Sequence, residues 1–382
     1  MNTFSGAALP FKGLRVLECA TVLAGPAVGA FFAELGAEGI KIEPPQGDVT
    51  RHWKLPSEDP KTTVSAYFSA VNWGKQSVVM DLNTQLDRFY ELVKTADIVI
   101  ANYKPGAAEK LRVDYPSLKK INPRLLYAHL TGYGIQNPRS GYDAIIQAES
   151  GFLYLNGHPA QPPVKMPVAL MDILAAHQMK EALLIGLLMR HRSGDQGAYY
   201  EVSLLDSALV SLVNQATNWL VAGHDPQPMG LEHPNIVPYG NIYTTADRQQ
   251  VMLAIGSDRH FQKLCHILGC AEISEDPRFI SNTERLRHRT VLNEQLEAAM
   301  AQHNADKLLQ SLWQAGIPAG KVRSVSEALS SPEAQALIFE KSHQKGLLHT
   351  SFNSSQFSRA EMSPPPELGQ HTALILNPLS PS

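Results

Sequence analysis

Apolar and polar residues follow two different periods along the first part of the chain. Residues 14–20 (LRVLECA) form a short, β-rich apolar run, and a turn containing Gly and Pro follows it. In residues 27–37 (AVGAFFAELGA) the apolar positions recur at helical spacing, and residues 38–43 (EGIKIE) have strand character again. This order predicts a strand–helix–strand unit, whose two strands pair in parallel.

The same alternation continues towards residue 222. Further strands and helices are predicted at residues 76–82, 85–96, 97–102, 124–134, 197–204 and 205–223. Strands that alternate with helices are typical of a parallel sheet covered by helices on both faces. We therefore predict an α/β fold class, with a large Rossmann-like lobe at residues 1–222 built on a mostly parallel sheet.

A second lobe is predicted after a proline-rich linker. Residues 223–240 hold four prolines and three glycines, a composition typical of connections. Residues 240–257 then alternate like a hairpin, and helical patterns follow at 258–269 and 282–315. We expect a smaller α+β lobe at residues 223–318, after which residues 319–382 return to complete the large lobe.

Composition narrows the class of protein. The chain has 382 residues, 44% of them hydrophobic and 18% charged, with a net charge of −3. Such a balance predicts a sizeable core and gives no basic patch for nucleic acid or an anionic membrane. The longest apolar run, residues 182–189, is too short to cross a bilayer. With three cysteines and no signal-peptide pattern, we expect a cytoplasmic protein without a metal site.

The first strand–helix turn does not match a dinucleotide site. That motif needs G-x-G-x-x-G, whereas this turn has only Gly25 and Gly29, with Pro26 between them. Glu43 ends the next strand where a ribose ligand would stand, but a structural turn is the simpler interpretation. The chain also has no G-x-S-x-G motif, and Cys19 falls inside a predicted core strand, where thiols are usually inert.

Asp172 is the most conspicuous candidate for chemistry. It stands near the start of residues 168–191, a long segment whose next charge downstream is Lys180. One interpretation is a helix N-cap that accepts from the amides of residues 174 and 175, although Ala175 replaces the Glu or Gln of a capping box. The other is a nucleophilic carboxylate that the helix N-terminus keeps ionised. From the residues alone both remain open.

The order of motifs resembles the class III (formyl-CoA transferase/carnitine-CoA transferase, or CaiB/BaiF) family of CoA-transferases. The segments that carry this resemblance span residues 13–26, 35–51, 72–82, 96–111, 121–134, 140–157, 168–191, 256–265, 315–322 and 368–376. They are spread in order along nearly the whole length of the chain. The resemblance implies an interlocked, ring-like homodimer and an enzyme that moves CoA between carboxylic acids with no cofactor beyond its CoA thioester substrate.

The resemblance also assigns residues. It implies that Asp172 is the catalytic nucleophile, forming aspartyl anhydride and aspartyl-CoA intermediates. The positions implied to bind coenzyme A are Leu23, Ala24, Lys75, Asn102, Tyr103, Lys104 and Lys110. At the last of these the family often has an arginine, and lysine lacks the two-pronged contact of a guanidinium with phosphate.

Two segments of the chain bear on the choice of substrate. Residues 233–239 and the C-terminal ending resemble the branch that uses succinyl-CoA and dicarboxylic acids such as glutarate, itaconate, mesaconate or malate; oxalate and carnitine fit less well. The candidates for binding the acceptor are His233, Asn235 and Tyr239. Two alternatives remain: a 2-methylacyl-CoA racemase of the same superfamily, which has histidine where this chain has Tyr142, and a non-catalytic acyl-CoA-binding protein.

Overall fold

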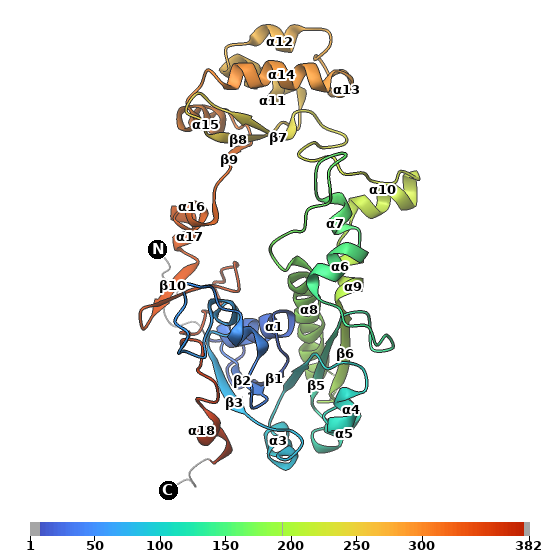
Figure 1. The fold of residues 1–382 in the computed structure, drawn as a ribbon, viewed down its shortest axis with the longest axis vertical. Coiled ribbons are helices and arrows are strands. Elements are labelled where there is room, and N and C mark those ends of the chain that lie inside the picture. Colours follow the sequence, from blue (N-terminus) through green and yellow to red (C-terminus); the bar gives the residue numbers. More distant parts are fainter. Residues whose placement is uncertain (1–7, 193, 378–382) are drawn as a thin grey trace. The chain divides into compact units, whose positions relative to one another are not determined.

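The chain divides into two compact units. The computed structural model describes residues 8–192 and 194–377. One unit comprises the chain up to Leu153, Lys165–His224 and the chain from Glu333 onward; the other comprises Tyr154–Val164 and Asp225–Pro332. We call them the large unit and the small unit, and describe each separately (Figure 1).

A parallel sheet forms the centre of the large unit. Within the described residues it has six strands in the order β3-β2-β1-β4-β5-β6, and every neighbouring pair is parallel. The strands are β1 (Arg15–Cys19), β2 (Glu38–Glu43), β3 (Lys75–Val79), β4 (Ile98–Ala101), β5 (Leu126–Thr131) and β6 (Ala198–Ser203). The order reverses between β1 and β4, as in dinucleotide-binding folds. The predicted α/β class and parallel sheet are confirmed.

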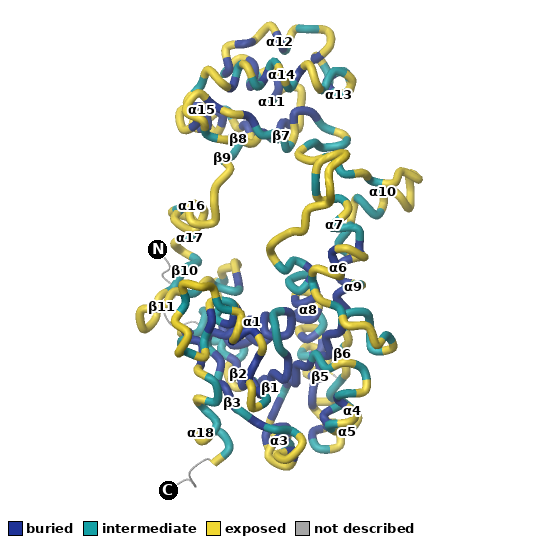
Figure 2. Tube along the Cα trace, viewed as in Figure 1, coloured by how far each residue is buried: buried dark blue, intermediate teal, exposed yellow. Residues whose placement is uncertain are grey.

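Helices connect these strands or follow the last of them. They are α1 (Ala24–Glu34), η1 (Val49–His52), α2 (Ala66–Ser69), α3 (Leu86–Val93), α4 (Ala107–Leu111), α5 (Tyr115–Ile121), α6 (Asp143–Glu149), α7 (Phe152–Leu155), α8 (Leu170–Arg192), α9 (Leu204–Val210), α10 (Asn214–Ala222) and α18 (Thr372–Leu376). The strands and α1 account for much of the buried chain in the large unit (Figure 2).

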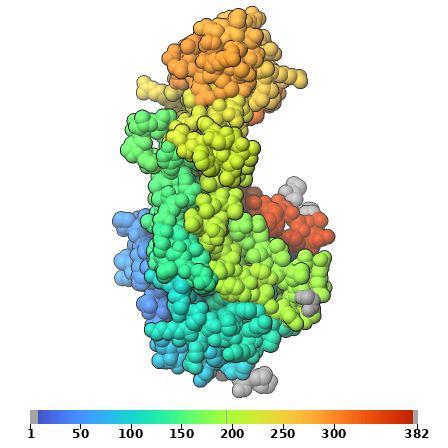
Figure 3. Space-filling model, turned by 90° about the vertical axis from the view of Figure 1, so that its right-hand side faces the viewer, coloured from blue at the N-terminus to red at the C-terminus, as the bar shows by residue number. Residues whose placement is uncertain are grey.

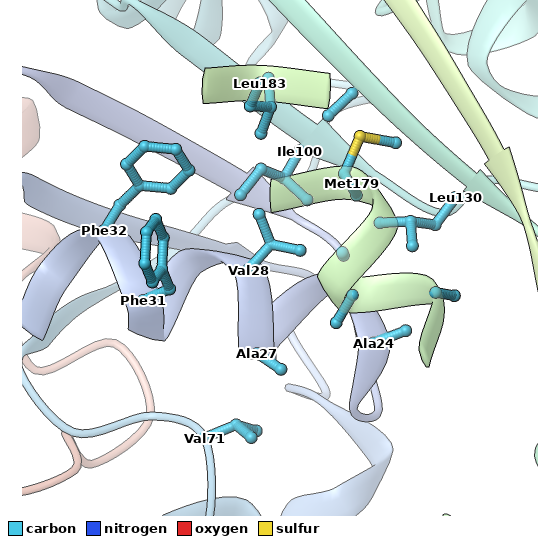
Figure 4. Packing of buried hydrophobic residues seen from close by; sticks show 14 of the residues in the cluster. Ala24, Ala27, Val28, Phe31, Phe32, Val71, Ile100, Leu130, Met179 and Leu183 are labelled. Carbon is cyan, nitrogen blue, oxygen red and sulfur yellow. The ribbon is translucent and has the colours of Figure 1, made fainter. Parts of the chain in front are cut away.

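Two cores lie on opposite faces of the sheet. On one face, side chains of α1 such as Val28 and Phe31 pack with Met179 and Leu183 of α8 against Ile100 of β4 (Figure 4). The other core is built around alternate strand residues, including Leu17 of β1 and Val99 of β4, and helices α3 to α5. This period-two division explains why the strands read as near-continuous apolar runs in the sequence.

The small unit is α+β, with its own core. Its antiparallel sheet joins β7 (Tyr239–Thr244), β8 (Gln250–Ala254) and β9 (Ala319–Lys321). Its helices are α11 (Asp258–Ile267), α12 (Ala271–Glu275), α13 (Asn282–Arg287), α14 (Arg289–Met300), α15 (Ala305–Gln314) and α16 (Val325–Leu329). The hairpin expected in residues 240–257 corresponds to β7 and β8.

The boundaries of the units differ from those expected at two places. Tyr154–Val164 belongs to the small unit, because the Gly230 amide donates to the Gly157 carbonyl at 2.8 Å and the Tyr154 hydroxyl donates to Gln227 at 2.6 Å. The small unit also extends to Pro332 instead of residue 318, and β9, which lies just beyond the expected limit, pairs with β8. Neither long-range pairing has a local sequence signal.

The C-terminal segment packs on the large unit. α17 (Pro332–Gln335) begins at the boundary, and β10 (Ile338–Lys341) pairs with β11 (Gln344–Leu347) in an antiparallel hairpin. Further on, the His371 amide donates to the Ser77 carbonyl of β3 at 2.9 Å.

No helix in the described parts of the chain combines the length and apolar character that a membrane crossing requires.

Candidate active site

A cavity opens at the carboxyl ends of β1, β4 and β5. Ligands of open α/β sheets bind at this edge, where the strand order reverses. The cavity has a volume of about 230 Å³. It is lined by Thr21, Val22 and Ala24 after β1, by Asn102–Pro105 after β4, by Leu130–Gly132 at the end of β5, and by Asn137, Arg139–Tyr142, Asp172 and Leu204.

Asp172 lies in the first turn of α8. The helix begins at Leu170, so Asp172 is its third residue and not its N-cap, as the first of the two interpretations required. The Ile173 amide already donates to the Ala169 carbonyl at 3.2 Å, so helical bonding starts before the position that we considered for the cap. Asp172 lines the cavity, and no hydrogen bond or ion pair to its carboxylate is found within residues 8–192 and 194–377.

The environment of Asp172 disfavours its charge. Burial raises the pKa of its carboxyl to about 7, and the neighbouring negative charge of Asp143 adds to this rise. A carboxyl with this pKa is divided between its two forms near neutral pH, and its ionised form lacks the solvation that would blunt its nucleophilicity.

Asp143 closes the N-terminus of α8. Its Oδ1 accepts from the Met171 amide at 2.8 Å, and its Oδ2 accepts from Gln147 Nε2 at 2.6 Å. Gln147 also exchanges two bonds with the backbone of Met166, at 3.0 and 3.2 Å. Asp143 thus supplies the cap that we had considered for Asp172, across 28 residues of sequence, which no local pattern could reveal.

Tyr67 on α2 lies within electrostatic reach of the same carboxylate. Burial raises the pKa of its hydroxyl, and the charges of Asp172, Asp143 and Asp48 raise it further. Its ring meets Trp53 edge to face at a centroid distance of 5.0 Å. Sequence reasoning missed Tyr67, because its segment carries no motif.

Four of the expected coenzyme A positions line the cavity: Ala24, Asn102, Tyr103 and Lys104. Asn102 binds the backbone of Thr21 with both ends of its amide, at 3.2 and 3.0 Å, so it joins the turns after β4 and β1. Burial raises the pKa of the Tyr103 hydroxyl. Leu23, half-buried, is the N-cap residue of α1 next to Ala24.

Lys75 is enclosed within the fold. Its Nζ is buried and donates to Glu18 at 2.6 Å, to the Pro26 carbonyl at 2.9 Å and to Asn72 at 3.0 Å. Burial lowers its pKa to about 8. All three donor positions of Lys75 are occupied inside the fold, so this geometry gives no support to the expected contact with coenzyme A, which stays a prediction.

Two other basic residues, Lys110 and Arg139, differ from the expectation in whether they line the cavity. Lys110 lies exposed on α4 and is not among the lining residues, so the structure gives the expected phosphate contact no support. Arg139, which sequence reasoning missed, lines the cavity with Lys104. Its guanidinium stacks over Tyr133 at 4.2 Å and bonds Glu149. The sequence signal that could have pointed to Arg139 was its place in a polar loop, rich in turn residues, just before Gly141–Asp143.

The three acceptor candidates lie together in the small unit. The rings of His233 and Tyr239 meet edge to face at 5.1 Å, and the Asn235 amide donates to His233 Nδ1 at 3.1 Å. Arg289 donates to the His233 carbonyl at 2.8 Å and pairs with Glu232 at 2.6 Å. The structure thus brings these residues together around one turn.

Comparison with known proteins matches the sequence of this chain to a family. The model of CoA-transferase family III matches residues 11–372. Succinate–glutarate CoA-transferase of Agrobacterium fabrum is 37% identical over 382 residues, covering 96% of this chain and 95% of its own length. Acetyl-CoA:oxalate CoA-transferase of Acetobacter aceti is 36% identical, covering 86% of this chain and 84% of its own.

Solved structures agree with these sequence matches. The crystal structure of a CaiB/BaiF family protein from Brucella suis superposes with a TM-score of 0.87 at 37% identity, covering 97% of this chain and 98% of its own. A family match over nearly the whole length, together with relatives above 30% identity, shows that the chain belongs to CoA-transferase family III.

Proposed function

We propose that this protein transfers coenzyme A from an acyl-CoA donor, succinyl-CoA in particular, to a small dicarboxylic acid, with Asp172 as the nucleophile. The observation that carries the proposal is the largely desolvated carboxylate of Asp172, which has no hydrogen-bond or ion-pair partner among the residues that the structure describes and lies in a cavity at the carboxyl edge of a parallel sheet. A carboxylate that only capped a helix would have its oxygens bonded to backbone amides.

The first half of the proposed reaction loads the enzyme. An Asp172 oxygen attacks the thioester carbonyl, the C–S bond breaks, and CoA leaves as a thiolate with a mixed anhydride remaining on Asp172. The thiolate then attacks the aspartyl carbonyl carbon and displaces the donor acid as its carboxylate. The product is an aspartyl-CoA thioester, and no charge is gained or lost overall.

The second half repeats these steps in reverse with the acceptor. The acceptor carboxylate attacks the aspartyl thioester and releases the CoA thiolate, which attacks the acceptor carbonyl and frees Asp172. The protein contributes the position of the reacting groups and a cavity that limits hydrolysis of the anhydride. Lys104 and Arg139 are suited to hold CoA phosphates at the rim, since both are cations that line the cavity.

A trapping experiment tests the nucleophile. The protein is incubated with succinyl-CoA, treated with hydroxylamine or borohydride, digested and analysed by mass spectrometry. We expect the modification on the peptide that carries Asp172. We expect Asp172→Ala to bind CoA and to lose transfer by at least about 10³-fold. An unmodified Asp172 in an active protein contradicts the assignment, and a protein that binds CoA without transfer is a non-catalytic acyl-CoA binder.

We also propose that His233, Asn235 and Tyr239 contact the acceptor. Relatives named for glutarate, D-citramalate and mesaconate support a dicarboxylic acceptor. The far carboxylate of such an acid needs a hydrogen-bond donor, and the His233 ring, the side-chain amide of Asn235 and the Tyr239 hydroxyl can offer one each.

The acceptor assignment is tested with a panel of acids. We expect His233→Ala and Tyr239→Phe to raise KM for C4–C6 dicarboxylates about tenfold, because each removes one hydrogen bond to a charged group. KM for monocarboxylates of equal length serves as the control and should change little. The panel includes oxalate, given the oxalate-specific name of one relative. An equal change for both classes of acid rejects a specific contact with the second carboxylate.

We propose, finally, that two copies of the chain form the interlocked dimer. Apolar side chains stand exposed on α10, where Leu220 is 76% and Val221 83% exposed, and Ile185 and Met189 are exposed on α8. Residues of α9 and α10 lie at the surface of the large unit (yellow-green in Figure 3). Exposed apolar side chains on helices are typical of a protein–protein interface.

A further inference from the structure

The turn that follows β1 is held by side chains of three other elements. The Ala20 carbonyl accepts from Lys41 Nζ at 2.9 Å, and the Thr21 amide and carbonyl both bond to Asn102. The Val22 amide donates to the carboxylate of Asp48, at 3.3 Å to Oδ2 and 3.4 Å to Oδ1. Each of these three residues therefore has its backbone bonded to a side chain from elsewhere in the fold.

Val22 has a backbone conformation that it would not adopt alone. Its φ is +73°, in the left-handed region, where a β-branched residue is a rare outlier. Such a conformation persists only where the surroundings enforce it, and it is found most often at functional sites. Thr21 and Val22 line the same cavity as Asp172, so the enforced turn is part of its wall.

Asp48 is itself rigidly placed. It is fully buried and accepts from the Thr50 amide at 3.0 Å, from the Thr50 hydroxyl at 2.8 Å and from Lys41 at 2.9 Å. Every group around its carboxylate, the Val22 amide included, is a hydrogen-bond donor. Only an ionised acceptor satisfies all of them.

The charge of Asp48 is balanced within a buried cluster. Lys41 pairs with both Asp48 and Glu18, Glu18 pairs with Lys75, and Arg51 pairs with Glu43. Three carboxylates thus face three cations, so the cluster has no net formal charge. Because the cluster is neutral, the negative charge of Asp48 is compensated next to the cavity wall. The cluster therefore adds little net electric field to the cavity.

We propose that Asp48 is a positioning residue for CoA transfer, holding the Val22 amide and thereby fixing the cavity wall at Thr21 and Val22 relative to Asp172. The inference rests on the proposed function. It assigns to Asp48 an effect on the chemical step beyond its part in the buried ion cluster, since small misplacements around reacting atoms are costly to the rate.

Asp48→Asn is the first test. The variant keeps the shape of the side chain but places an NH₂ group among donors only, so the turn must shift. We expect kcat per folded enzyme, and the rate of enzyme–CoA thioester formation, to fall about 10- to 100-fold. We expect KM for the acyl-CoA to change by less than about threefold, because most of the cavity is unaltered.

Glu34→Gln is the matched control. Glu34 is also fully buried and also faces donors only: the amides of His349 and Thr350, the Thr350 hydroxyl and Arg359. It lies at the far end of α1 and does not line the cavity. We expect this variant to lower Tm as Asp48→Asn does while kcat per folded enzyme stays within about twofold of the wild type.

Thr50→Val keeps the inference testable if Asp48→Asn does not fold. It removes only the hydroxyl that orients Asp48, and we expect kcat to fall by about two- to fivefold with KM unchanged. The inference is overturned if Asp48→Asn or, where that variant does not fold, Thr50→Val retains wild-type kcat per folded enzyme, or if Glu34→Gln loses as much. A wild-type protein without any transfer would instead reject the proposed function.

Discussion

At the scale of single residues, Asp172 and Asp143 have separate roles. The sequence suggested Asp172 both as candidate nucleophile and as helix cap, whereas the structure gives the cap to Asp143. Asp172 stands inside the first turn of α8, with no partner for its carboxylate in the described part of the chain, and Asp143 accepts from the amide of Met171 at the helix start. Asp172 was identified from the sequence as a candidate, but its partner was not. The reason is physical, because a cap supplied by another element leaves no local spacing to read.

The pH dependence of loading follows from this pair. Burial and the charge of Asp143 raise the pKa of Asp172 to about 7, so its nucleophilic form is lost as pH falls through that value. We expect the rate of enzyme–CoA thioester formation to rise with pH up to about 7 and then to level off. Asp143→Asn removes the repelling charge, so the midpoint should move to lower pH, remaining above the ordinary aspartate value because burial is the larger cause.

The pH profile is measured by quenched flow with mass spectrometry across pH 5–9. Asp143→Glu, which keeps the charge, is the control and should leave the midpoint near that of the wild type. A midpoint that rises in Asp143→Asn, or does not move, would show that Asp143 does not act on Asp172 through its charge.

At the scale of elements, the helix α1 was easy to predict from its apolar spacing, but the role of its Gly and Pro residues was hard to infer from the sequence. All 11 of its residues are buried, so it has no polar face, and its small residues allow close approach to the sheet. Gly29 is the closest contact: a Cβ there would stand 2.0 Å from Glu18 Oε2. The Gly and Pro pattern around this helix therefore serves packing over a buried ion pair, in agreement with the structural-turn interpretation.

Gly29→Ala tests this packing. The added methyl group collides with a carboxylate that Lys41 and Lys75 hold in place, so we expect a loss of about 1–3 kcal/mol in the free energy of unfolding. Gly39→Ala on β2 is the control, because its Cβ would meet only ordinary contacts at 3.5 and 3.6 Å. We expect its effect to stay below about 1 kcal/mol. Equal losses in chemical denaturation would reject the proposed collision.

At the scale of the whole molecule, α8 carries two apolar faces. Ala175, Met179 and Leu183 are buried in the core of the large unit, whereas Ile185, Leu188 and Met189 are exposed. The exposed side is polar at His177, Gln178 and Glu181 and becomes apolar from Leu184 to Met189, and such an exposed apolar stretch is typical of an interface. The exposed side of α8, with α10, is the surface that we assign to the second copy of the chain.

Mass in solution tests the dimer. We expect light scattering to give twice the mass of one chain for the wild type. Leu220→Glu combined with Val221→Glu should shift the population towards monomer or lower the yield of folded protein, because it places charges in an apolar interface. Asn214→Glu at the start of the same helix is the control. A monomeric wild type would reject the dimer.

The sequence by itself determined the α/β class, the parallel sheet and the family, because these depend on local periodicity and on motifs in order along the chain. It also singled out Asp172 and the turns after β1 and β4. Only the tertiary structure decided that Lys75 is enclosed by Glu18, Pro26 and Asn72, that Arg139 joins Lys104 at the cavity, and that residues 154–164 belong to the small unit. These outcomes depend on which distant groups become neighbours, and burial and pairing between them leave no spacing in the sequence.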